Sequence, residues 1–230
     1  MQGENGVDRA KERLLAAALP HVAFDGWAEA ALKGAIADSG IAEGLARALF
    51  PRGGVDMALE WHRAGDAGLA DALAARDLAA LRYRDRIALA VRLRIEAAGD
   101  REAVRRGTAL FALPQHAGDG ARAVWATADA IWLALGDTSR DVNWYTKRAT
   151  LSAVYGSTVL YWLGDDSPGQ AASWEFLDRR IEGVMAIEKL KAKARDNGLV
   201  KAVMEGPLAF VQRIVAPKLP DDLPGSMFPK

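Results

Sequence analysis

Three residues near the middle of the chain, Trp144, Tyr145 and Arg148, are of the types that dominate protein–protein hot spots. They lie at positions i, i+1 and i+4, so Trp144 and Arg148 share one face if a helix has begun by Trp144. In one interpretation, Trp144 packs into the core and the Arg148 guanidinium covers its ring in a cation–π contact. In the other, the residues form an exposed surface for a partner protein. Residue type alone favours the packed arrangement.

The remaining reactive residue types offer little chemistry. The three histidines are far apart, none is preceded by glutamate three positions earlier as a di-iron site would need, and we expect each to be structural. The chain has no cysteine, which excludes thiol nucleophiles, disulfides and cysteine metal sites. There is no phosphate-binding loop, dinucleotide fingerprint or catalytic triad. We therefore expect no catalytic residue, no metal and no cofactor, and hence a protein that is not an enzyme.

Composition indicates a globular chain with a sizeable core. The 230 residues are 50% hydrophobic and 26% charged, and 30 basic residues balance 30 acidic ones. A chain of zero net charge is not an obvious polyanion binder. No apolar run approaches the length of a transmembrane helix. The first residues resemble neither a signal peptide nor a transit sequence, which favours a cytoplasmic location.

Apolar residues recur at helical spacing through most of the chain, and no strand-like alternation is present, so we predict an all-α fold. The helix that begins near residue 7 should end near Leu19 because Pro20 follows. Asp141 or Asn143 could cap a helix that continues to residue 163. Other helices are expected at 29–39, 43–50, 56 onward, 63–80, 82–95, 100–113, 125–135 and 168–196. The helix over 82–95 is rich in arginine, which favours a solvated face; an acidic partner or lipid headgroups are the alternative.

The first 62 residues suggest a helix-turn-helix arrangement whose spacing resembles the N-terminal domain of TetR-type regulators. The helix in the recognition position carries a single basic residue, Arg47, and Glu43 stands where a phosphate would approach. Acidic side chains also outnumber basic ones over this region. Since phosphate contacts supply most non-specific affinity for DNA, we expect the fold without nucleic-acid binding.

Three motifs carry a more specific resemblance: residues 112–116 (ALPQH), 136–148 (GDTSRDVNWYTKR) and 165–168 (DDSP). With them, the chain resembles the lipid-binding accessory proteins of ubiquinone biosynthesis, which have a TetR-like fold. The resemblance implies a homodimer that binds an isoprenoid quinone lipid or its precursor and presents it to a di-iron demethoxyubiquinone hydroxylase. It also implies attachment to the surface of the inner membrane. A TetR-type ligand-sensing transcriptional regulator is the alternative.

The resemblance to TetR-type regulators and the resemblance to the ubiquinone biosynthesis proteins together suggest the domains. Residues 1–62 form the helix-turn-helix-like bundle, and residues 63–198 form a larger helical region for lipid binding and dimerisation, with 146–163 and 168–196 as the dimer helices. Residues 199–216 form an amphipathic helix, and 217–230 a disordered tail. The apolar side of that last helix could dock back on the core or lie on a membrane surface, and the expected membrane-contact residues are Leu208, Phe210, Val211, Ile214 and Val215.

The apolar faces of four helices exceed what pairwise packing requires, which suggests a pocket for a polyprenyl tail, although the faces could instead fill one another. The candidate lipid-binding residues are Leu110, Phe111, Leu113, Trp125, Ile131, Trp132, Leu135, Val154, Tyr155, Val159, Trp162, Leu177, Ile181 and Met185. The resemblance also changes the interpretation of the central motif. It implies an exposed surface for the hydroxylase, formed by Asp141, Trp144, Tyr145 and Arg148.

Overall fold

The computed structural model describes residues 2–195, with the side chains of residues 6–186. All regular structure in this part of the chain is helical, as expected. The helices are α1 (Gln2–Asp25), α2 (Glu29–Ser39), α3 (Glu43–Leu49), α4 (Gly54–Ala67), α5 (Leu69–Ala74), α6 (Tyr83–Glu96), α7 (Arg101–Phe111), α8 (Ala117–Ala134), α9 (Val142–Leu163), the 3-10 turn η1 (Pro168–Gln170) and α10 (Ala171–Arg195). The expected amphipathic helix at 199–216, the five membrane-contact residues on it and the tail lie outside the described residues.

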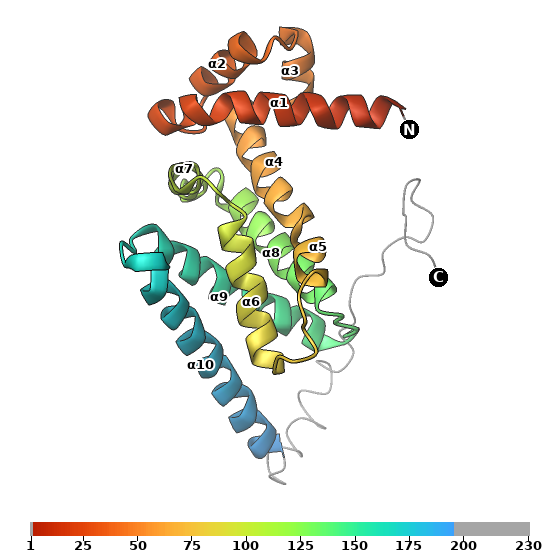
Figure 1. Cartoon of the computed structure of the whole chain (residues 1–230), viewed down its shortest axis with the longest axis vertical. Coiled ribbons are helices and arrows are strands. Elements are labelled where there is room, and N and C mark those ends of the chain that lie inside the picture. Colours follow the sequence, from red (N-terminus) through yellow and green to blue (C-terminus); the bar gives the residue numbers. More distant parts are fainter. Residues whose placement is uncertain (1, 196–230) are drawn as a thin grey trace.

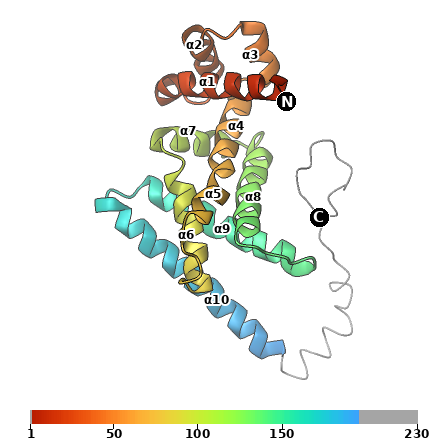
Figure 2. The same ribbon diagram turned by 45° about the vertical axis from the view of Figure 1, so that its right-hand side comes forward.

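The buried apolar residues form two cores. The first joins α1, α2, α3 and α4 and includes Ala103 of α7. The second joins α5, α6, α8, α9 and α10. Figures 1 and 2 show α1–α3 gathered at one end of the molecule, with α4 leading from that bundle toward the larger helical body. The bundle of α1–α3 with the start of α4 and the larger helical body each have a core of their own, and the domain bound expected at residue 62 stays a prediction.

The prediction that Pro20 ends the first helix is wrong, because α1 continues to Asp25. Pro20 removes one backbone donor, but it lies on the exposed side of the helix, where water can reach the carbonyl left unpaired. Two residues later Val22 is fully buried in the first core and holds the last turn in place. The chain then turns at Gly26, whose positive φ of 68° suits glycine.

Several helix boundaries follow from capping residues that the sequence made visible. α2 has the predicted bounds and ends at Gly40, which adopts the left-handed conformation. The Asp141 carboxylate accepts a hydrogen bond from the backbone of Asn143 and caps α9. The helix expected at 125–135 begins earlier, because α8 already starts at Ala117 and includes a Gly-rich stretch. Gly120 is needed for packing, since a Cβ there would lie 2.6 Å from that of Phe111.

The first residue of α4 packs closely against the backbone of the turn before α2. A Cβ on Gly54 would lie 2.3 Å from the backbone oxygen of Trp27, so only glycine permits this approach. The Trp27 indole in turn donates a hydrogen bond of 3.0 Å to the Ala103 carbonyl of α7. These two contacts fix Trp27 where the two parts of the molecule meet.

Candidate functional site

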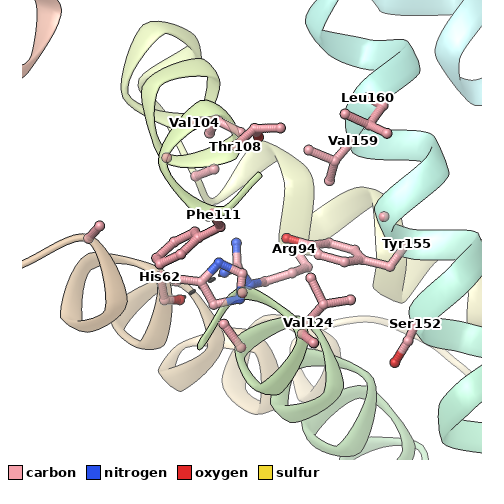
Figure 3. A pocket seen from close by; sticks show the side chains of 18 of the residues that line it. His62, Arg94, Val104, Thr108, Phe111, Val124, Ser152, Tyr155, Val159 and Leu160 are labelled. Carbon is pink, nitrogen blue, oxygen red and sulfur yellow. Dashed lines mark hydrogen bonds between the residues drawn. The ribbon is translucent and has the colours of Figure 1, made fainter. Parts of the chain in front are cut away.

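A cavity of about 890 Å³ lies between α4, α6, α7, α8 and α9. Its volume is in the upper part of the range of ordinary small-molecule sites. Figure 3 shows Val104, Phe111, Val159 and Leu160 around it, together with polar side chains that include His62 and Arg94. Trp27 also lines the cavity, so one wall belongs to the helix-turn-helix-like bundle.

The space exists because small residues face it from several helices. They are Ala58, Ala64, Gly65, Gly107, Gly120, Ala121, Ala123, Ala149, Ala153 and Gly156. At Gly156 in the middle of α9, an added Cβ would meet no atom within 4 Å. Close-packed interiors leave few voids of this size, so the cavity is suited to hold a molecule.

The structure places five of the fourteen candidate lipid-binding residues on the cavity wall: Phe111, Trp125, Tyr155, Val159 and Trp162. Their side chains come from α7, α8 and α9. Tyr155 and Trp162 are also part of the buried second core. These five are the candidates for direct contact with a ligand.

The other nine do not line this cavity. Most of them belong to the packed second core, where apolar faces fill one another: Ile131, Trp132, Leu135, Val154, Leu177, Ile181 and Met185. Leu110 packs against the first core, and Leu113 is 44% exposed. Trp132, Val154, Ile181 and Met185 line a separate cavity of about 170 Å³. Helical periodicity finds apolar faces but cannot distinguish a filled contact from an open one.

Sequence reasoning missed a polar group on the cavity wall. His62 and Arg94 line the cavity, and behind them the Arg94 Nε donates a hydrogen bond of 2.5 Å to Asp66. The His62 Nε2 lies 2.8 Å from the Thr127 hydroxyl, which donates to the same Asp66 carboxylate at 2.9 Å. The available sequence signal was the pair His62 and Asp66 at i and i+4. Arg94 was expected in a solvated face, yet it is 2% exposed.

Burial also changes the protonation of this polar group. It lowers the pKa of His62 to about 4, and the nearby positive charge of Arg94 acts in the same direction. The histidine is therefore neutral at neutral pH. Burial likewise raises the pKa of Tyr155, which keeps its hydroxyl protonated. We expected His62 to be only structural and did not predict that it lines the cavity.

At the expected partner surface, Arg148 is buried rather than exposed. Its side chain is 1% exposed, and its guanidinium lies 2.5 Å from Asp129 and 3.3 Å from Asp137. It also lies 4.1 Å from the centre of the Trp144 ring, so the cation–π contact of the packed interpretation is present. The expectation of an exposed Arg148 is wrong because two carboxylates draw the guanidinium inward.

The remaining residues of that patch stay accessible. Asp141 is exposed, and Trp144 and Tyr145 are half-buried, with their rings in an edge-on contact at 4.8 Å. Trp125 lies 5.9 Å from Trp144 and also lines the cavity. One aromatic pair thus connects the cavity wall with the surface at the start of α9.

Two arginines of the helix-turn-helix-like bundle form ion pairs within the protein. Arg47 of α3 pairs with Glu29 at 3.0 Å and with Glu43 at 2.9 Å. Arg52 pairs with Asp56 and, in the larger region, with Asp119. The absence of nucleic-acid binding stays a prediction, and these ion pairs agree with it.

Residues 2–195 contain no cluster of three histidine, aspartate or glutamate side chains that could hold a metal ion. In the same part of the chain, no helix has the length and apolar character needed to cross a membrane.

Comparisons with known proteins agree on a family. Residues 117–188 match the family model described as COQ9. The chain is 31% identical over 189 residues to the mitochondrial ubiquinone biosynthesis protein COQ9 of Drosophila melanogaster, covering 80% of this chain and 58% of that protein. It is 28% identical over 217 residues to the COQ9 protein of Xenopus tropicalis, covering 89% and 66%. The chain thus spans about three fifths of the length of these relatives.

Among solved structures, a TetR transcriptional regulator from Nitrosomonas europaea has the same fold. It superposes with a TM-score of 0.62 at 16% identity, over 76% of this chain and 97% of the regulator. At this identity the likeness concerns the fold alone. The family match, the alignments along most of the chain and the shared fold together identify the protein as a relative of the COQ9 ubiquinone biosynthesis proteins, built on a TetR-like fold.

Proposed function

We propose that this chain acts in ubiquinone biosynthesis as a non-enzymatic lipid-binding protein. It binds an isoprenoid quinone precursor in the cavity and presents it to a di-iron demethoxyubiquinone hydroxylase. The observation that carries the proposal is the cavity of about 890 Å³, with a largely apolar wall that includes Phe111, Trp125 and Val159. A polyprenyl tail gains about 0.8 kcal/mol for each CH₂ that it buries in such surroundings.

Presentation to a partner is supported by the aromatic link between the cavity and the surface. Trp125 belongs to the cavity wall and contacts Trp144, which is half-buried beside Tyr145. Aromatic side chains of this kind are enriched at the centres of protein interfaces. In this proposal the hydroxylase-facing surface consists of Asp141, Trp144 and Tyr145. The buried Arg148 holds the Trp144 ring in place through the cation–π contact.

Two further elements complete the proposal. The protein is a homodimer that pairs through α9 and α10, as the TetR-like architecture favours, and light scattering after gel filtration would measure the expected doubled mass.

The protein also attaches reversibly to the membrane that carries its lipid, through the segment that contains Leu208 and Val211. Replacing both with glutamate should abolish flotation with liposomes; undiminished flotation would exclude that segment as the contact.

The first test is mass spectrometry of an organic extract of the folded, detergent-free protein. Stoichiometric ubiquinone or a precursor is expected. An extract without isoprenoid lipid would contradict the lipid-binding proposal.

The second test separates lipid binding from presentation. Trp144→Ala should abolish hydroxylation of the quinone precursor in a reconstituted reaction while the variant retains its lipid. Gly44→Phe on exposed α3, where an added Cβ meets no atom within 4 Å, serves as the control for a remote change. Undiminished hydroxylation with Trp144→Ala would remove this residue from the partner surface.

A further inference from the structure

The titratable side chains that line the cavity lie close to one another. His62 comes from α4, Arg94 from α6 and Tyr155 from α9. Figure 3 shows the Tyr155 hydroxyl directed away from α9, toward the side of the cavity where His62 and Arg94 lie. The rings of His62 and Tyr155 meet edge-on at 6.5 Å, and the Arg94 guanidinium lies 5.8 Å from the centre of the Tyr155 ring. Three polar side chains from separate helices therefore converge on the same region.

Packing and hydrogen bonds hold these side chains in place. Arg94 donates to Asp66 at 2.5 Å and to the His62 carbonyl at 2.8 Å. The Thr127 hydroxyl, which is fully buried, donates to Asp66 and contacts the His62 ring. A Cβ on Gly65 would lie 2.8 Å from the Arg94 guanidinium, so a larger residue at this position would displace it. Fixed polar groups in an apolar pocket are the usual means of orienting a ligand.

The charges of the cluster decide which ligand it suits. Asp66 offsets the positive charge of Arg94 at 2.5 Å, and burial keeps His62 neutral at neutral pH. The cluster therefore carries no net charge toward the cavity. A phosphate would bring a negative charge into a buried site that has no free positive charge to match it. A neutral oxygen needs only a hydrogen-bond donor, which a tyrosine hydroxyl supplies.

We infer that His62, Arg94 and Tyr155 form a polar subsite that binds the uncharged, oxygen-bearing end of the ligand, a ring carbonyl or hydroxyl, while the hydrocarbon end lies along α7 and α9. This inference rests on the proposed lipid binding and adds the orientation of the lipid and its selectivity. Asp66 and Thr127 act as positioning residues. The subsite selects a quinone-type lipid over a phospholipid and over a bare hydrocarbon.

A competition experiment tests the subsite. The full-length, delipidated protein is incubated with equimolar benzoquinone bearing a three-unit isoprenoid tail, farnesene as the hydrocarbon without a ring, and phosphatidylcholine. The protein is then separated by gel filtration, and mass spectrometry quantifies each retained lipid. The native protein should retain the quinone over both competitors by at least about ten-fold.

Two variants remove polar atoms without removing the rings. Tyr155→Phe deletes one hydroxyl, and His62→Phe deletes the ring nitrogens. Each should lower the preference for the quinone over farnesene by about three- to ten-fold, the loss expected for one hydrogen bond. The matched control is Tyr161→Phe, the same substitution on α9 at a residue that is 40% exposed and absent from the cavity wall. It should keep the native ratio.

The outcomes distinguish this inference from the proposed function. An unchanged ratio in both Tyr155→Phe and His62→Phe, with lipids still retained, overturns the subsite and leaves lipid binding intact. Preferential retention of phosphatidylcholine overturns the charge argument. If the folded protein retains none of the three lipids, lipid binding itself fails and the subsite falls with it.

Discussion

Arg148 and Asp137 depend on each other at the start of α9. The arginine side chain is 1% exposed and the aspartate side chain 4%. The pKa of Asp137 lies below its usual value although burial raises it, because Lys147, Ser139 and Arg148 all stabilise the carboxylate. A buried charge of this kind is tolerated only while its partners are present.

Removing the arginine should therefore destabilise the protein rather than only weaken a surface contact. Arg148→Met leaves Asp137 buried with less compensation, and we expect a loss of roughly 3–5 kcal/mol in the free energy of unfolding, measured by urea denaturation. Arg140→Met, a change of the same type at an exposed residue eight positions earlier, should have little effect. Equal midpoints for the two variants would show that the buried ion pair contributes nothing to stability.

His62 predicts a pH dependence of stability. Its pKa in the folded protein is about 4, below the ordinary value of 6.5, so the unfolded chain binds the proton more readily. Stability should therefore fall as the pH decreases from about 6.5 to about 4, by roughly 3 kcal/mol in total. His62→Gln lacks this titration, and its stability should vary less over that range. Parallel curves for the two proteins in urea denaturation at each pH would contradict the assignment.

At the scale of the helix, Gly156 leaves space in the cavity because this residue of α9 lines the wall without a side chain. Gly156→Phe should fill part of the cavity and reduce the lipid that co-purifies, as measured by mass spectrometry. The fold should persist, because an added Cβ meets no atom within 4 Å and phenylalanine has a higher helix propensity than glycine. Gly44→Phe on exposed α3 should leave the lipid content unchanged. Native lipid content in Gly156→Phe would place the ligand elsewhere.

Helices were predictable from the sequence because apolar periodicity and capping residues are local. The bounds of α2 and the cap of α9 at Asp141 follow from residues within a turn of the helix end. The continuation of α1 through Pro20 could not be predicted in this way, because it depends on the burial of Val22 against residues of other helices. The same limit applies to the site. The apolar wall was partly predicted, but the empty space depends on how alanine and glycine faces of separate helices meet, and the Arg94–Asp66 pair joins residues 28 positions apart.

At the scale of the whole molecule, we predict that the helix-turn-helix-like bundle does not bind DNA. Arg47, the basic residue on α3, is held by Glu29 and Glu43. We expect no mobility shift of duplex DNA even at about 50 mM salt, where phosphate contacts are strong. A TetR regulator with its own operator is the positive control. A shift that weakens as salt increases would instead support the ligand-sensing regulator.

Trp27 gives the cavity a consequence for how the molecule unfolds. This residue belongs to the first core, is tied to α7 through the Ala103 carbonyl and also forms part of the cavity wall. A hydrocarbon tail in the cavity would therefore contact both the bundle and the larger region. Its apolar contacts would join the two cores. Ligand that binds only the folded state stabilises it by mass action. The filled protein would melt as one cooperative unit, whereas emptying the cavity would let the two cores melt separately.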